Sequence, residues 1–206
     1  MMTDFLKDYH IINNLSEVFD FRNMEHKLLK KHGEWFYAIK EQRLVELQNA
    51  YHAFCGKYLD YTPESLINLG EFFLCAIDTE KLSSKEYAML RAKYPPEIPV
   101  DDFKFTIRSW SLMVDVGIYF GEVMIRNHKN MEWKQNIIKD KRDIERGYMV
   151  IILNHNKYKP YMNPIWVSGI MASKVADNTF SSTRIYELYN YYCEKVAQEY
   201  MPDTTS

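Results

Sequence analysis

The chain has 206 residues, of which 47% are hydrophobic, 15% aromatic and 26% charged, and its formal net charge at pH 7 is -2. This length suffices for a well-packed core, and we expect a single domain over residues 1–206, with an N-terminal helical part at 1–58 and a main α+β part at 59–206. The nearly balanced charge excludes the general basic excess that attracts nucleic acids.

The cysteines and histidines give no sign of a disulfide-stabilised or metal-binding protein. Cys55, Cys75 and Cys193 are odd in number and far apart, so neither a disulfide framework nor a zinc knuckle is expected. The six histidines form no HExxH, no HxH and no i,i+4 pair. No leader pattern and no run of about 18 uncharged apolar residues occurs. The sequence predicts a soluble cytoplasmic protein without cofactor, bound metal, membrane attachment or nucleic-acid partner.

The N-terminal part shows helical spacing of its apolar residues. Residues 3–32 predict two short helices, Gly33 predicts a break, and 34–58 predict a long amphipathic helix that ends at Gly56. The polar residues between the apolar positions of this long helix are Lys40, Glu41, Arg43 and Gln48.

Two capping signatures mark the next helices. Thr62 followed by Pro63 is typical of a helix start, because proline at the first helical position loses no hydrogen bond. Ser83 followed three residues later by Glu86 is a capping box. The predicted helices are 63–78 and 84–93, and the prolines at 95, 96 and 99 predict a stiff, extended connector after them.

The segment 103–126, which we call the spine helix, is apolar over most of its circumference. A helix of this kind has to be surrounded by other elements, so we expect it at the centre of the fold. Gly117 and Gly121 on its apolar side predict a close approach of another element. Placing residues every 100° leaves one polar stripe within about 40° of Asp115. The stripe contains Lys104, Arg108, Ser111, Asp115, Tyr119, Glu122 and Arg126.

The stripe has two interpretations. Asp115 and Glu122 share one face, and two such carboxylates could converge on a metal ion or a substrate proton. Glu122 also precedes Arg126 at the i,i+4 spacing that favours an ion pair, and Arg108 balances Asp115 in charge. We therefore expect an ion-paired or solvated stripe, with the carboxylate site as the alternative.

The pattern changes to strands after the spine helix. Residues 132–139 and 148–153 predict two antiparallel strands, and 149–153 are apolar on both faces, as in an interior strand. Asn163 and Pro164 favour a helix to about residue 175, although Ile165, Trp166 and Val167 would also suit a strand. A last helix follows at 182–200. The predicted fold is α+β and predominantly helical, with a central long helix and a small antiparallel sheet from about residues 132–162.

The last helix carries a tyrosine stripe with Tyr186, Tyr189 and Tyr200, and Tyr192 can present a second face, so the candidate interface is Tyr186, Tyr189 and Tyr192. Tyrosine combines apolar area with a polar tip, which is typical of protein interfaces. The same tyrosines could instead cover the core with their hydroxyls in water. The stripe is a candidate interface.

Four stretches occur in an order that resembles a loosely defined group of bacterial α+β proteins without an established activity. They are LDYTPESLINLGEFF at 59–73, GIYFGEVMI at 117–125, EWK at 132–134 and NPIWV at 163–167. The resemblance implies a bacterial α+β domain, with immunity or accessory proteins expected among its relatives. It assigns no catalytic residue.

The functional expectation is a non-enzymatic protein-interaction module, such as an immunity or accessory factor. Its protein partner would bind the tyrosine stripe or the charged edge of the spine helix. The alternative is an enzyme of unfamiliar type with a pocket around Asp115 and Glu122, next to Tyr119.

Overall fold

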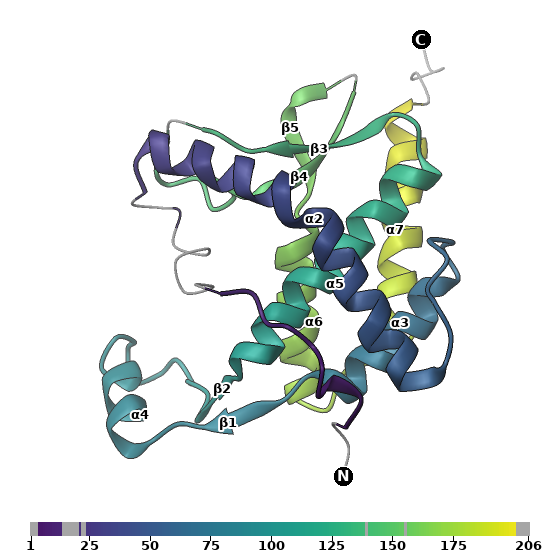
Figure 1. Ribbon diagram of the computed structural model, residues 1–206. Coiled ribbons are helices and arrows are strands. Elements are labelled where there is room, and N and C mark those ends of the chain that lie inside the picture. Colours follow the sequence, from purple (N-terminus) through teal and green to yellow (C-terminus); the bar gives the residue numbers. More distant parts are fainter. Residues whose placement is uncertain (1–3, 14–20, 22–23, 139, 155, 201–206) are drawn as a thin grey trace.

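The computed structural model describes residues 4–13, 21, 24–138, 140–154 and 156–200. The fold is α+β and predominantly helical, with small antiparallel sheets, as predicted. Figure 1 shows helices α2 and α5 crossing at the centre, with α5 lying between α2 and α6 and with α3 and α7 to one side.

The N-terminal part differs from its prediction. Instead of a first short helix, residues 4–13 form a 3-10 turn, η1 (Asp4–Leu6), and an irregular segment, which we call the N-terminal strap. Leu6 and Ile12 of the strap are buried, so packing against α2 and α5 overrides local helical spacing. The second predicted helix falls partly on residues 14–20 and 22–23, which lie outside the described residues.

Helix α2 (His26–Cys55) is longer than predicted because Gly33 lies inside it. A Cβ atom at Gly33 would lie 2.4 Å from Oε1 of Gln135, so this glycine permits close packing and does not break the helix. Gly56 does end the helix, with a left-handed φ of 74°.

Of the two predicted caps, only the second is present as expected, because α3 (Ser65–Ala76) begins two residues later than predicted and its N-cap residue, Glu64, makes no side-chain cap hydrogen bond. The hydroxyl of Thr62 accepts a hydrogen bond from the Ser65 amide at 3.3 Å, just before this helix. The capping box of Ser83 and Glu86 is complete at the start of α4 (Ser84–Arg91).

Residues 79–105 form an excursion, which we call the arm. Its base is an antiparallel pair of short strands, β1 (Thr79–Lys81) and β2 (Phe103–Phe105), and Figure 1 shows it projecting from the helical body. The prediction that the spine helix begins at residue 103 is wrong, because residues 103–105 form β2 and pair with β1. Thr106 instead caps the helix and accepts a hydrogen bond from the Ser109 amide.

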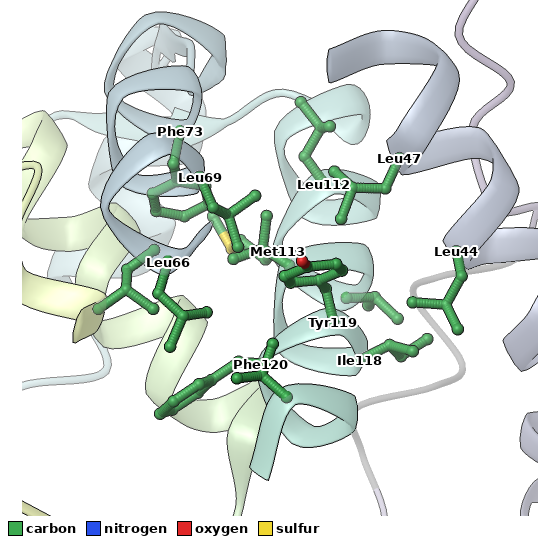
Figure 2. Close-up of a cluster of buried hydrophobic side chains, with 14 of the residues drawn as sticks. Leu44, Leu47, Leu66, Leu69, Phe73, Leu112, Met113, Ile118, Tyr119 and Phe120 are labelled. Carbon is green, nitrogen blue, oxygen red and sulfur yellow. The ribbon is translucent and has the colours of Figure 1, made fainter. Parts of the chain in front are cut away.

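Helix α5 (Ile107–Asn127) is the observed spine helix, and every residue from 111 to 124 is buried. Figure 2 shows its apolar side chains between those of α2 and α3. A Cβ at Gly117 would lie 2.6 Å from the Cα of Ile165, and one at Gly121 would lie 2.0 Å from the Trp133 ring. The predicted close approaches are confirmed.

The three-stranded sheet contacts α5 through β3, where Trp133 lies against Gly121. Its order is β3-β4-β5, both pairs are antiparallel, and all five residues of the central strand β4 are buried, as expected of an interior strand. The predicted helix after Asn163 and the last helix are also present. The bounds are β3 (Met131–Gln135), β4 (Met149–Leu153), β5 (Asn156–Met162), α6 (Pro164–Ala176) and α7 (Arg184–Tyr200).

Candidate functional site

The centre of the predicted stripe is a buried polar network at the α2–α5 crossing. Arg43 of α2 holds Asp115 of α5 in a two-pronged contact, with Nε 2.8 Å from Oδ1 and Nη2 2.7 Å from Oδ2. Tyr9 of the strap donates its hydroxyl hydrogen to Asp115 and lies 3.0 Å from the hydroxyl of Ser111. The side chain of Asp115 has no exposed surface, so the ion pair is enclosed.

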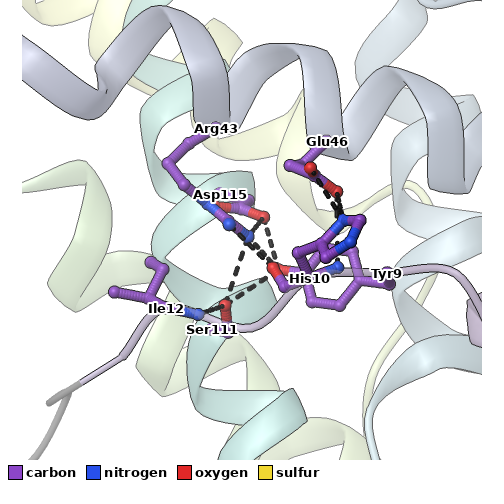
Figure 3. A network of polar contacts seen from close by, with 7 residues as sticks. All are labelled: Tyr9, His10, Ile12, Arg43, Glu46, Ser111 and Asp115. Atoms are coloured by element: carbon purple, nitrogen blue, oxygen red, sulfur yellow. Dashed lines mark hydrogen bonds and ion pairs between the residues drawn. The ribbon is translucent and has the colours of Figure 1, made fainter.

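The strap closes this network, as Figure 3 shows. The His10 carbonyl accepts a hydrogen bond from Nη1 of Arg43 at 2.7 Å, and the Ile12 amide donates to the Ser111 hydroxyl at 2.9 Å. Arg43 thus binds α5 and the strap at once. This geometry joins three segments that are far apart in the sequence.

Burial controls the titration of these groups. Loss of solvation raises the pKa of Asp115 to about 6, and the hydrogen bonds and charge of Arg43 oppose the rise. The pKa of Tyr9 is raised, first by burial and then by the charge of Asp115. At pH 7 the carboxylate is ionised and Tyr9 is a neutral donor. Asp115, Arg43 and Tyr9 use their hydrogen bonds on one another, as the members of a structural ion pair do.

Glu122 belongs to a second polar cluster on the same face of α5. Its Oε1 contacts Nζ of Lys40 and accepts a hydrogen bond from the Trp133 indole at 2.9 Å. Its Oε2 lies 3.5 Å from Nε of Arg126, so the predicted i,i+4 ion pair is present. Lys40 and Arg43 of α2, which sequence reasoning left as ordinary polar positions, supply the main counter-charges.

The remaining stripe residues have other surroundings. The hydroxyl of Tyr119 lies 2.8 Å from both the Ser65 hydroxyl and the Tyr61 amide, and burial raises its pKa to about 12. Asp115 pairs with Arg43 and not with Arg108, so the expected balance within one helix is wrong at this position. Lys104 lies on β2, outside the stripe.

A groove of about 320 Å³ lies beside the strap and α2. Asp115 and Glu122 are not among its lining residues, so the two carboxylates do not face it. The lining residues are Phe5, Lys7, Asp8, Tyr9, His10, Glu46, Asn49, Ala50 and Ala53.

The candidate tyrosine interface is largely covered. Tyr189 is only 7% exposed, and Tyr186 and Tyr192 are partly buried against the core. Tyr189 contacts His128, and the carbonyl of Tyr192 accepts a hydrogen bond from Tyr161. These contacts match the interpretation in which the tyrosines cover the core.

The arm is the surface that sequence reasoning missed. None of the residues of α4 is buried, although the helix and the turn after it contain large apolar side chains. The exposed large apolar residues of the arm are Tyr87, Met89, Tyr94 and Ile98. The predicted cap and prolines located this segment, but nothing local indicated that it would lack a covering element.

Metal ions and the lipid bilayer would require two other kinds of site. In the described part of the chain, no three histidine, cysteine, aspartate or glutamate side chains gather closely enough to hold a metal ion. Across the ranges that the structure covers, no helix has both the length and the apolar character that crossing a bilayer requires.

No family model, curated protein or solved structure matches the chain. The resemblance to the bacterial α+β group therefore stays a prediction.

Proposed function

We propose that the protein is a non-enzymatic protein-binding module and that the arm is its binding surface. The observation that carries the proposal is that α4 buries none of its residues while it presents Tyr87 and Met89 to solvent. Exposed apolar side chains gathered on one projection mark interaction sites, and tyrosine and methionine are enriched in protein interfaces.

Internal contacts prepare the arm for binding. The guanidinium of Arg91 donates to the carbonyls of Pro95 and Ile98 at 2.8 and 3.0 Å, which fastens the turn after α4. At the base, Lys104 lies 2.7 Å from Glu86 and 3.3 Å from Glu80. A surface already held in shape loses less conformational entropy on binding.

The charges of the arm indicate the chemistry of its partner. Lys104 is shared between two carboxylates, and Lys81 lies 3.8 Å from Asp102, so these charges are engaged with one another within the arm. The apolar side chains then supply the main attraction. We infer a partner protein with an apolar groove, in keeping with the accessory or immunity role expected from the sequence.

The carboxylates of α5 support this proposal over the enzyme alternative. Asp115 and Glu122 are each held by a cation from α2, and neither faces the groove beside the strap. A general acid or base has to reach a substrate atom. Their geometry favours a structural role.

Affinity capture from the source cells, with variant chains as bait, tests the proposal. The arm variant Tyr87→Ser with Met89→Ser should lose the partner, whereas Tyr191→Ser, which alters an exposed tyrosine of α7, should retain it. The captured partner is then purified and its Kd measured by calorimetry. We expect the arm variant to raise the Kd at least about tenfold, equivalent to about 1.4 kcal/mol.

Two results would contradict this function. A purified partner that binds wild type and the arm variant with equal Kd would remove the arm as the surface. The second result is that wild type captures and crosslinks no protein, under conditions where a known complex is recovered. This result would count against a binding module.

A further inference from the structure

A histidine, a cysteine and a tyrosine meet where the end of α5 contacts α7. Nε2 of His128 lies 3.0 Å from Sγ of Cys193 and 3.1 Å from the hydroxyl of Tyr189. Tyr189 and Cys193 are one turn apart on α7, so both face the imidazole. His128 is the C-cap residue that follows α5, and all three side chains are at least partly covered.

Burial keeps this cluster neutral at rest. It lowers the pKa of His128 and raises that of Cys193. The imidazole is therefore unprotonated at neutral pH and the sulfur carries its hydrogen. Burial also raises the pKa of Tyr189, with contributions from Cys193 and then from Glu64, and Glu194 adds to the rise at Cys193. Both carboxylates favour the neutral, protonated forms of Cys193 and Tyr189.

The hydrogen-bonding capacity of Nε2 makes the cluster suited to proton transfer. In the tautomer that carries its hydrogen on Nδ1, the Nε2 atom of neutral His128 has one lone pair, so it accepts one hydrogen at a time from its two neighbours. When the thiol donates to Nε2, the Tyr189 hydroxyl can donate to the sulfur. After proton transfer, the thiolate would have two donors, the imidazolium and the phenol.

Cys55 has a different neighbour from Cys193. Cys55 is exposed, and its thiol contacts the carbonyl oxygen of Tyr51 at 3.5 Å, which is not a base. Cys193 has an imidazole nitrogen in hydrogen-bond reach, which is the arrangement of an assisted sulfur nucleophile. The reactivities of Cys55 and Cys193 can therefore be compared within one chain.

We propose that Cys193 is a site of reversible modification by low-molecular-weight disulfides, with His128 as the base. The Cys193 sulfur attacks one sulfur of the reagent while its hydrogen moves to Nε2 of His128. The S–S bond of the reagent breaks, and the leaving thiolate takes the proton back from His128. The products are a mixed disulfide on Cys193 and one free thiol, so atoms and electrons balance.

The test uses the full chain with Cys55→Ser and Cys75→Ser, so that Cys193 alone reacts, and oxidised glutathione as the probe. Mass spectrometry follows formation of the mixed disulfide between pH 6.5 and 8. An unassisted thiol reacts about tenfold faster per pH unit in this range, since its rate follows the thiolate fraction. We expect Cys193 to show a much shallower rise, because neutral His128 is already available as the base.

Substitution of the base should restore ordinary thiol behaviour. His128→Gln should slow the reaction at pH 7 by about tenfold or more and steepen its pH profile. His52→Gln, which alters an exposed histidine stacked on Tyr58, should leave both unchanged. Circular dichroism checks folding, and if His128→Gln does not fold, the profile with His128 intact decides alone.

Three results would overturn the proposal. They are a tenfold rise per pH unit with His128 intact, an unchanged rate in folded His128→Gln, and no modification of Cys193 when Cys55 of the unsubstituted chain is fully modified.

Discussion

Charged side chains are ordinarily exposed and apolar ones buried, and two regions of this protein depart from that rule, the α2–α5 crossing for charged side chains and the arm for apolar ones. The crossing buries a carboxylate and a guanidinium, Asp115 and Arg43, whereas the arm leaves Tyr87 and Met89 in solvent. Buried charges are costly unless they are fully paired, and exposed apolar side chains gain nothing from folding. The comparison separates a region organised for structure from one available for binding.

The largest effect is expected from breaking the buried pair. Asp115→Asn keeps the shape of the side chain but leaves the Arg43 charge buried without a counter-charge. The free energy of unfolding at pH 7.5 should fall by about 3–5 kcal/mol, measured by urea denaturation.

Two controls sharpen this prediction. Arg43→Met combined with Asp115→Leu removes both charges and should recover most of the loss, because no unpaired ion remains. Lys104→Gln breaks an exposed ion pair of the arm and should alter stability far less. If Asp115→Asn is as stable as wild type, the ion pair does not organise the crossing.

A smaller effect is expected where α5 meets the sheet. Gly121→Ala would place a methyl group 2.0 Å from the Trp133 ring, whose indole N–H donates a hydrogen bond to Glu122. Such overpacking should lower the free energy of unfolding by about 1–3 kcal/mol. Gly169→Ala on α6 is the control, since its Cβ would meet nothing within 4 Å, and it should stabilise by up to about 1 kcal/mol. Equal effects of the two substitutions would show that Trp133 yields easily.

The pH dependence of stability should reveal a further titratable group of α2, the partly buried His32. Burial lowers the pKa of His32 to about 4, where it stacks on Trp35. Because the folded pKa lies below the ordinary 6.5, its contribution is present above pH 6.5 and is lost as the pH falls toward 4. Asp115, with a raised pKa, acts in the opposite direction over pH 6 to 3.8, so the two partly cancel.

A variant isolates the histidine contribution. Relative to His32→Phe, wild type should lose about 2–3 kcal/mol between pH 6.5 and 4, measured by urea denaturation at each pH. The Asp115 contribution is common to both chains and drops out of the difference. Parallel stability curves for the two chains would mean that His32 can be charged without cost.

The smallest effect on stability is expected in the arm. Met89→Ser removes an apolar side chain that is 60% exposed, so the free energy of unfolding should change by no more than about 0.5 kcal/mol. A loss above about 2 kcal/mol would show that Met89 belongs to the core, and would remove the contrast between arm and crossing.

Most elements were predictable because their signals are local. The Ser83 cap, the left-handed Gly56 and the apolar strand around Ile151 each depend on neighbours within a few residues. The errors fall where distant segments compete with local preference. Residues 103–105 continue a helical pattern but pair with β1, and Gly33 resembles a break but lies against Gln135.

The candidate site was predicted in part. The stripe with Asp115 and Glu122 followed from helical geometry, since seven residues are nearly two turns. Its counter-charges on α2 and the hydroxyl of Tyr9 could not follow, because no spacing connects residues about 70 to 100 positions apart. The meeting of His128 with Cys193 was unpredictable for the same reason.

The amino-acid sequence by itself determined the elements, the central position of the apolar helix and the line of charges along it, since periodicity and capping act within a few turns. Only the tertiary structure decided which charges meet, which tyrosines are covered and which helix remains exposed. These outcomes depend on contacts between segments far apart in the chain, and the free energy of such contacts is fixed by burial and distance in space.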